Sequence, residues 1–248
     1  MNAPPPLRTD QALFLDLDGT LVEIAEHPID VVVPVGLKLT LTAARAQLGG
    51  ALALVSGRSL AQIDLLFGGY PFDVAGSHGS EWRCTGGMDV IEAPPASALE
   101  EVVSHIAAAA RSDRGLYIGG LYIERKPHSI ALHFRADPSL AGEAWRLARE
   151  GLAILGADYR LQEGKAVVEI LPASAQKGSA IDRFMQSLPY LGRVPLFAGD
   201  DLTDESGFVA VNLRHGISIR IGDPGGETSA QYLLPSPAAL REWLESSL

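Results

Sequence analysis

Two apolar segments lead into acidic residues, and these two junctions restrict the possible fold more than any other feature of the chain. The predicted strand 12–17 (ALFLDL) carries Asp16 near its end and is followed by Asp18, whereas residues 194–198 (VPLFA) precede Asp200 and Asp201. Short apolar runs of this kind are typical of strands buried on both faces in a parallel sheet. Ligands bind outside the carboxyl ends of such strands. The sequence therefore predicts that both acidic pairs lie at one edge of a parallel sheet.

The rest of the chain predicts an α/β core that is interrupted by a separate domain. Apolar segments alternate with amphipathic ones before residue 94 and again after Pro172, which is typical of a doubly wound sheet. Residues 94–171 instead suggest strands and two helices in a small α+β layer, with a hairpin that turns at Gly164. We predict a Rossmann-like core from residues 1–93 and 172–248, an inserted cap domain at 94–171, and hinges near Pro94–Pro95 and Leu171–Pro172.

Composition excludes several classes of protein. Hydrophobic residues make up 47% of the 248 residues, which is enough for a sizeable core, and no apolar run approaches the ~18 residues of a membrane span. The formal charge of −10 disfavours nucleic acid as a partner, because its binding requires Lys and Arg to neutralise phosphates. The single cysteine, Cys84, excludes an internal disulfide. The first residues do not resemble a signal peptide, so we expect a cytoplasmic protein.

The acidic junctions have a structural interpretation as well as a chemical one. Asp-Gly after a strand is a common turn, and acids favour helix N-termini, which would suffice to explain the acids at positions 204 and 205. However, four acids within residues 200–205 repel one another unless a cation lies among them. Mg²⁺ prefers hard oxygen ligands of this kind. The predicted metal ligands are the carboxylates of Asp16 and Asp200 and the backbone carbonyl of Asp18, with Asp201 behind them.

Two further residues are typical of a site for an anion. Ser56 ends the second predicted strand and precedes a helix that Ser59 and Gln62 are predicted to cap, so its hydroxyl and the nearby N–H groups suit an anion. Lys177 lies in the first turn of a predicted helix, where its charge opposes the helix dipole. Ser-Gly is also an ordinary turn, and such a lysine commonly points into water. An anionic substrate near Asp16 would need both residues.

Together these segments indicate phosphoryl transfer through a covalent aspartyl phosphate. Asp16 would attack phosphorus, Asp18 would act as acid and then base, and Mg²⁺, Ser56 and Lys177 would hold the charged oxygens. DLDGT at 16–20, Ser56, Lys177 and GDD at 199–201 stand in the order of the four motifs of the haloacid dehalogenase superfamily, which the chain resembles. The second acid, two residues after the nucleophile, is typical of its phosphatase branch.

More specific strings, above all GDDLTDE at 199–205, resemble the trehalose-6-phosphate phosphatase family. The resemblance implies a Mg²⁺-dependent phosphoric monoester hydrolase of trehalose biosynthesis, with a small sugar phosphate as its substrate. It also assigns sugar contacts to residues of the cap and of the core: Glu124, Lys126, Arg135, Lys165 and Glu169 in the cap, and Arg58, His78 and Glu81 in the core. Independently, Glu124 and Lys126 share one strand face, as do Lys165 and Glu169 by the same period of two. The alternative is that these are solvent-exposed strand charges.

Two other functions stay open at this point. Another sugar phosphatase or a phosphomutase of the same superfamily would carry the same core, because substrate choice depends on the geometry of the cap. A phosphosugar-binding module without catalysis would be expected to lack the nucleophile or a metal-binding acid, yet Asp16, Asp18, Lys177 and Asp200 are all present. The sequence carries no indication of protein partners.

Overall fold

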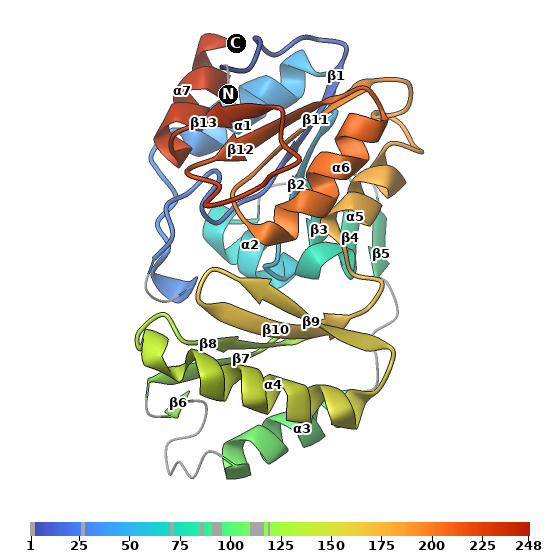
Figure 1. The fold of residues 1–248 in the computed structure, drawn as a ribbon. Coiled ribbons are helices and arrows are strands. Elements are labelled where there is room, and N and C mark those ends of the chain that lie inside the picture. The colour runs from blue at the N-terminus through green and yellow to red at the C-terminus, as the bar shows by residue number, and fades with distance from the viewer. Residues whose placement is uncertain are drawn as a thin grey trace. The chain divides into compact units, whose positions relative to one another are not determined.

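The protein divides into two compact units in the computed structural model (Figure 1), which describes residues 3–25, 28–69, 72–84, 87–90, 96–109, 117–118 and 120–248. Unit 1 comprises Met1–Asp89 and Gln176–Leu248, and unit 2 comprises Val90–Ala175. The predicted hinge at Pro94–Pro95 lies outside the described residues. Leu171 and Pro172, predicted as the second hinge, are the last two residues of a strand in unit 2. The domain boundaries inferred from the sequence therefore stay predictions.

Unit 1 is built on an eight-stranded sheet in the order β13-β12-β11-β1-β2-β3-β4-β5. Neighbouring strands from β13 to β3 run parallel, and β4 pairs with β3 in the antiparallel direction. The pairing of β4 was not predicted. The strands are β1 (Gln11–Leu15), β2 (Leu52–Val55), β3 (Asp73–Gly76), β4 (Glu81–Cys84), β5 (Gly87–Val90), β11 (Val194–Gly199), β12 (Ile217–Ile221) and β13 (Tyr232–Leu234).

The strand order of the unit 1 sheet reverses between β1 and β11. From β1 the chain continues to β2 and β3 on one side, then returns at β11 and continues to β12 and β13 on the other side (Figure 1). In doubly wound sheets, ligands bind outside the carboxyl ends of the strands at such a reversal. Leu15 of β1 is in register with Ala198 of β11, so both predicted acidic junctions follow at this edge.

Helices on unit 1 explain why β1 and β2 are buried at every position. Phe14 of β1 stacks on Tyr190 and packs against Phe184 of α5, while Phe197 of β11 packs against Phe208 of α6. Such dense aromatic packing fixes the strand ends that carry the site. The helices of unit 1 are α1 (Leu37–Gln47), α2 (Leu60–Phe67), α5 (Lys177–Phe184), α6 (Glu205–Leu213) and α7 (Pro237–Ser246), with short 3-10 turns η1 (Pro28–Asp30), η2 (Ser77–Gly79) and η4 (Leu202–Asp204).

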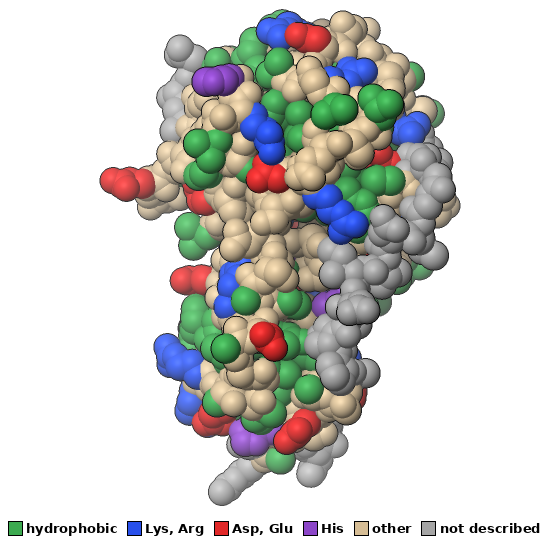
Figure 2. Space-filling model, turned by 90° about the vertical axis from the view of Figure 1, so that its right-hand side faces the viewer, with side chains coloured by type: hydrophobic (Ala, Val, Ile, Leu, Met, Phe, Trp, Pro, Cys, Tyr) green, Lys and Arg blue, Asp and Glu red, His purple; other side chains and the backbone are tan. Residues whose placement is uncertain are grey.

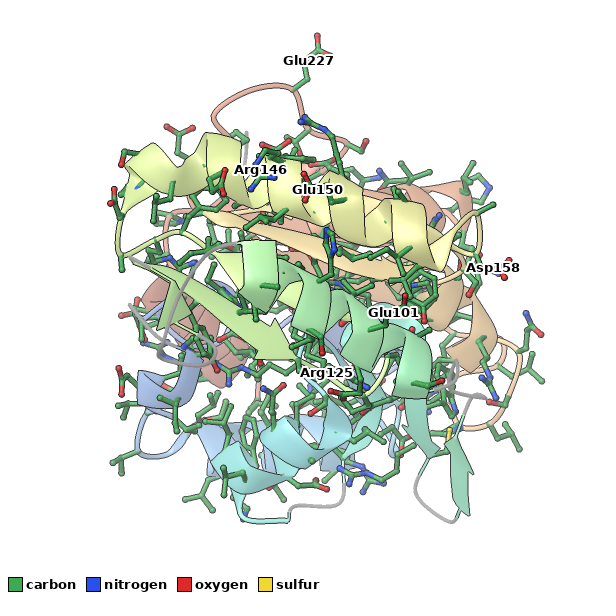
Figure 3. All side chains as sticks on the ribbon, turned by 90° about the horizontal axis from the view of Figure 1, so that it is seen from below. Glu101, Arg125, Arg146, Glu150, Asp158 and Glu227 are labelled. Carbon is green, nitrogen blue, oxygen red and sulfur yellow. The ribbon has the colours of Figure 1, made fainter. Side chains whose placement is uncertain are left out.

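Unit 2 is a five-stranded antiparallel sheet with helices packed on one face. Ile123, Leu132 and Val168 of the sheet form its core with Leu99 and Leu147 of the helices. On the outer side of α4, Arg146 and Glu150 form an exposed ion pair (Figure 3). In sheet order the strands are β6 (Tyr117–Ile118), β7 (Leu121–Arg125), β8 (Ile130–His133), β10 (Val167–Pro172) and β9 (Tyr159–Gly164), and the helices are α3 (Ala96–Ala109), the turn η3 (Pro138–Leu140) and α4 (Ala141–Leu155).

None of the helices in the described part of the chain combines the length and the apolar character that a membrane crossing would need.

Candidate functional site

Asp16 lies at the switch point of the unit 1 sheet and is almost fully buried, with 4% of its surface exposed. Its backbone N–H donates to the carbonyl of Ala198 at 3.0 Å, which extends the pairing of β1 with β11 by one residue. Lys177 Nζ, at the start of α5, lies 2.7 Å from Asp16 Oδ1, and Thr20 Oγ1 donates to Asp16 Oδ2 at 3.0 Å. Both oxygens of this buried carboxylate therefore accept a hydrogen bond from the protein.

The turn after Asp16 brings the second acidic junction against the first. Gly19 has a φ of 82°, a conformation that favours glycine, and its N–H donates to Val22 O at 2.8 Å. A Cβ at this position would overlap the carboxylate of Asp200. Thr20 Oγ1 also lies 3.4 Å from Asp200 Oδ1. The Asp-Gly turn is thus more than a reversal of the chain, since the close approach of Asp200 depends on the missing side chain.

Asp204 holds the lysine and the acidic loop together. Its Oδ1 lies 2.6 Å from Lys177 Nζ, and its Oδ2 accepts the backbone N–H groups of Asp200 and Asp201, each at 2.9 Å. The side chain is completely buried. The sequence suggested only a helix-start role for Asp204, so reasoning from sequence missed this network. The available signal was Lys177, because a lysine in the first turn of a buried helix requires an acid partner.

The carboxylates of Asp16, Asp200 and Asp204 form an oxygen-rich cluster. One oxygen of each lies within 4.8 Å of the others. Burial raises the pKa of Asp16 well above its usual value; Lys177 opposes this shift, and the nearby charges of Asp204 and Asp200 reinforce it. Burial alone would lower the pKa of Lys177, but the attraction of Asp16 and Asp204 outweighs it and raises that pKa. Three acids against one ammonium leave excess negative charge, and an oxygen-only donor set of this kind fits a hard divalent cation.

The other two predicted metal-site residues have different surroundings. The Asp201 side chain accepts the N–H of Leu202 at 2.7 Å and caps η4. Asp18 pairs with Arg58 through two bonds, Nε to Oδ2 at 2.7 Å and Nη2 to Oδ1 at 2.8 Å. Arg58 Nη2 also donates to Pro28 O at 2.9 Å. Arg58, predicted from resemblance to contact the sugar, is thus bound to the predicted acid–base residue.

Ser56 and the remaining two predicted core-side residues lie in three neighbouring segments of unit 1: the loop after β2, the turn η2 and the start of β4. Ser56 is buried at the end of β2; its hydroxyl accepts the N–H of Arg58 at 3.2 Å, and its carbonyl accepts the N–H of His78 at 2.9 Å. The His78 ring lies so near Gly57 that a Cβ there would be 2.7 Å from Nε2. Glu81 accepts the N–H of Leu60, at the start of α2, at 2.5 Å. His78 and Glu81 therefore contact the loop that carries Ser56.

In unit 2 the structure brings three predicted sugar-binding residues onto one face of the sheet. Glu124 on β7 and Glu169 on β10 both lie opposite Ala131 of the intervening strand β8. Their strand neighbours belong to the core under the helices, so these carboxylates lie on the opposite face. Lys126 Nζ is 3.0 Å from Glu169 Oε1, and His133 Nε2 is 2.9 Å from Glu124 Oε2. The predicted face is therefore polar, and its charges are paired within the unit.

Lys165 and Arg135 are placed differently. Lys165 lies in the turn between β9 and β10, outside either strand, so the prediction that it shares a strand face with Glu169 is wrong. Arg135 Nη2 donates to the carbonyl of Lys165 at 2.9 Å, which ties these two residues to each other at the hairpin. The period-two argument failed because the hairpin turn includes two residues between the strands.

The described residues form no broad cationic patch on the face shown in Figure 2. Lys and Arg side chains are scattered there among acidic and apolar ones. With 20 Lys and Arg residues against 30 Asp and Glu residues, attraction of an anion depends on local cations. In the Asp16 cluster that cation is Lys177.

The chain is similar to known proteins over nearly its whole length. The trehalose-phosphatase family model matches residues 14–237. A trehalose-6-phosphate phosphatase of Escherichia coli (strain K12) is 42% identical over 250 residues, which cover 99% of this chain and 89% of that protein. The solved C-terminal domain of C. albicans trehalose-6-phosphate phosphatase has a TM-score of 0.81 at 23% identity, covering 98% of this chain and 92% of that one.

A haloacid dehalogenase-like hydrolase from B. subtilis has a TM-score of 0.64 at 16% identity, covering 96% of this chain and 100% of that one. At these identities the two structures show the fold alone. The predicted α/β fold of the haloacid dehalogenase type is thereby confirmed.

Proposed function

Because the chain belongs to the trehalose-phosphatase family, we propose that it hydrolyses the phosphate ester of trehalose 6-phosphate, using Mg²⁺ and an aspartyl-phosphate intermediate. The observation that carries the mechanism is the buried cluster of Asp16, Asp200 and Asp204 around Lys177. A nucleophilic carboxylate, a fixed ammonium group and a set of oxygen ligands are the parts that phosphoryl transfer requires.

Asp16 and Asp200 are the carboxylates that would hold Mg²⁺, together with the backbone carbonyl of Asp18. Asp204 differs from Asp16 in that its Oδ2 accepts two backbone N–H groups, whereas Asp16 accepts hydrogen bonds from the side chains of Lys177 and Thr20. We therefore assign Asp204 to holding Lys177 and the acidic loop rather than to binding the metal. Asp201 would lie behind the ligands, where it caps η4. When bound, the ion would supply electrostatic stabilisation of the phosphate oxygens, the main source of acceleration in such reactions.

The reaction takes place in two steps. In the first, an Asp16 oxygen attacks phosphorus, the bond from phosphorus to the sugar oxygen breaks, and Asp18 gives its proton to the leaving oxygen. In the second, Asp18 takes a proton from water, the water oxygen attacks phosphorus, and the bond from phosphorus to Asp16 breaks to release phosphate. Lys177 and the Ser56 hydroxyl would bind phosphate oxygens during both steps.

Sugar recognition is proposed for the polar sheet face of unit 2. Glu124, Lys126 and Glu169 offer there the mixture of donors and acceptors that sugar hydroxyls require. Lys126 pairs with Glu169, and Glu124 contacts His133, so contacts within unit 2 hold these side chains on the face. Contacts from Arg135, Lys165, Arg58, His78 and Glu81 stay predictions from the resemblance.

A panel of sugar phosphates, with Mg²⁺ and with a chelator, tests the substrate and the metal together. We expect phosphate release to be fastest from trehalose 6-phosphate and to disappear in the chelator. The substrate assignment fails if glucose 6-phosphate is hydrolysed equally well. A phosphomutase of the same superfamily would convert a sugar phosphate to its isomer with little release of phosphate, so analysis of the sugar products separates that alternative.

The Asp16→Asn variant tests the covalent mechanism. We expect turnover to be almost completely lost while the circular dichroism spectrum stays that of the wild type, because the amide is a poor nucleophile of similar shape. Asp182→Asn is a suitable control, since Asp182 forms an exposed pair with Arg214 on the surface of unit 1. Retained turnover in Asp16→Asn would exclude the aspartyl phosphate.

A further inference from the structure

We propose that Arg58 is a positioning residue that orients Asp18 for proton transfer, and that the segment 76–81 holds Arg58 in place. The inference rests on the proposed phosphatase function, in which Asp18 is the acid and the base. It differs from the assignment of Arg58 to sugar binding, because Arg58 would act through Asp18 and would matter for substrates that contain no sugar.

The geometry of the pair supports this role. Arg58 donates to both Asp18 oxygens, at 2.7 and 2.8 Å, and the planar guanidinium thereby fixes the plane of the carboxylate. The Arg58 side chain is only 9% exposed, whereas the Asp18 side chain is 33% exposed. The third bond of Arg58, to Pro28 O at 2.9 Å, does not involve Asp18. Arg58 can therefore keep its place while one Asp18 oxygen turns to the leaving group and the other stays bonded.

The backbone of Arg58 is held in place by Ser56 and by the segment 76–81. Its N–H donates to Ser56 Oγ, and its carbonyl accepts the N–H of Ser77 at 2.8 Å. Ser77 and His78 have φ values of 48° and 57°, which non-glycine residues adopt only where their surroundings hold them. Glu81 provides part of that hold, because it accepts from Ser77 Oγ at 3.3 Å and from the N–H of Leu60. This strained segment thus connects α2 to the loop that carries Arg58.

The chemical consequence depends on the leaving group. When the bond from phosphorus to the leaving oxygen breaks, a phenolate needs the proton of Asp18, whereas the more stable p-nitrophenolate can leave without it. Phenyl phosphate and p-nitrophenyl phosphate contain no sugar, so sugar contacts cannot influence their comparison. Loss of proton transfer should therefore slow phenol release far more than nitrophenol release in the first turnover.

The test measures first-turnover release of phenol and p-nitrophenol with enzyme in excess and Mg²⁺ present. For Asp18→Asn we expect phenol release to fall by about 10²-fold or more, with a much smaller change for nitrophenol. For Arg58→Gln we expect the same pattern with about a tenfold fall for phenol, since misplacement weakens proton transfer without removing it. The double variant that combines Asp18→Asn with Arg58→Gln should release phenol and nitrophenol at the same rates as Asp18→Asn alone.

Two variants separate this role from a merely structural one. Arg83→Gln removes another Arg–Asp pair of unit 1, in which the single nitrogen Nη1 of Arg83 lies 2.8 Å from both oxygens of Asp64. This variant should leave the ratio of the two rates unchanged. Arg58→Lys keeps the charge but not the planar fork, so its rate of phenol release should lie between those of wild type and Arg58→Gln. If Arg58→Gln does not fold, Arg58→Lys takes its place in the test.

Three results would overturn the inference. Equal slowing of both esters by Arg58→Gln would place the effect on the phosphate group or on folding. A further fall in the double variant would show that Arg58 does not act through Asp18. If wild-type protein with Mg²⁺ releases no phosphate from trehalose 6-phosphate, the proposed phosphatase function itself fails, and the inference fails with it.

Discussion

Replacing Asp204 with alanine should destabilise unit 1, because several buried donors share this one carboxylate. The backbone N–H groups of Asp200 and Asp201 each donate to Oδ2 at 2.9 Å, and Lys177 Nζ lies 2.6 Å from Oδ1. Lys177 retains Asp16 at 2.7 Å in the variant, so the main loss is that of the two N–H groups. A buried donor that loses its acceptor costs ~1–3 kcal/mol, which gives about 2–6 kcal/mol for two.

Part of this cost is offset, because the substitution also removes one of three neighbouring negative charges. We therefore expect Asp204→Ala to lower the free energy of unfolding of unit 1 by about 2 kcal/mol or more. Asp204→Asn should cost less, since its amide oxygen can serve either the two N–H groups or Lys177, while its NH₂ group faces the other donor. The expected order of stability is wild type, Asn, Ala.

Urea unfolding in the presence of a chelator measures this effect without a contribution from bound metal. Because the chain has two units, hydrogen exchange of peptides from β1 and β11 should report the transition of unit 1 by itself. The control is Asp182→Asn on α5, whose exposed pair with Arg214 should contribute less than about 0.5 kcal/mol. The proposed network is refuted if Asp204→Ala is as stable as this control.

Three further changes have equally definite outcomes. Gly19→Ala places a side chain at a φ of 82° and against Asp200, and we expect it to destabilise unit 1 by about 2 kcal/mol or more in the same urea assay. Mg²⁺ at ~100 times its Kd should add about 2.7 kcal/mol to stability, seen as a higher melting temperature, and an equal rise in Asp200→Asn would contradict the metal site. The hydrogen bond from Arg241 lowers the pKa of Glu23, so this pair stabilises the fold above the usual glutamate pKa. That contribution, at most ~1 kcal/mol at such an exposed site, is lost as pH falls through the folded pKa, and melting curves of Glu23→Gln should show a weaker decline in acid.

The parallel sheet and the approach of Asp16 to Asp200 could be predicted because local signals there agree with the fold. The apolar runs predicted β1, β2 and β11, which are almost entirely buried in the structure. Because ligand sites lie at the carboxyl ends of parallel strands, the same runs predicted that Asp16 and Asp200 lie close together. The helix cap predicted at Ser59 and Gln62 is confirmed, since both reciprocal bonds are present. The predicted family and the enzyme class, a phosphoric monoester hydrolase, are confirmed by the family match and the relatives.

Partner choice among charged side chains could not be predicted in the same way, because it depends on contacts between distant segments. Arg58 is separated by 40 residues from Asp18, and neither strand period nor helix period relates two such loops. Lys126, which follows β7, pairs with Glu169 of β10 across the intervening strand β8. The sequence had instead placed Lys165 on one strand face with Glu169, on the assumption of one continuous strand. The length of the hairpin turn between β9 and β10 decides which residues belong to β10. A turn longer or shorter by one residue would reverse which side chains of the strand share a face.

Asp204 shows the same limit at the centre of the site. An acid in the first turn of a helix has a sufficient local explanation, namely attraction to the N-terminal end of the helix dipole. In the structure Asp204 does have that local role, because its Oδ2 accepts the N–H of Asp201 at the start of η4, but its Oδ1 lies 2.6 Å from Lys177 Nζ at the start of α5. Lys177 therefore contacts two acids: Asp16, which the motif order had placed near it, and Asp204, for which the sequence suggested only a helix-start role. A buried cation near a cluster of acids is the signal that should have prompted a search for a second carboxylate, because one partner alone leaves its remaining protons without acceptors.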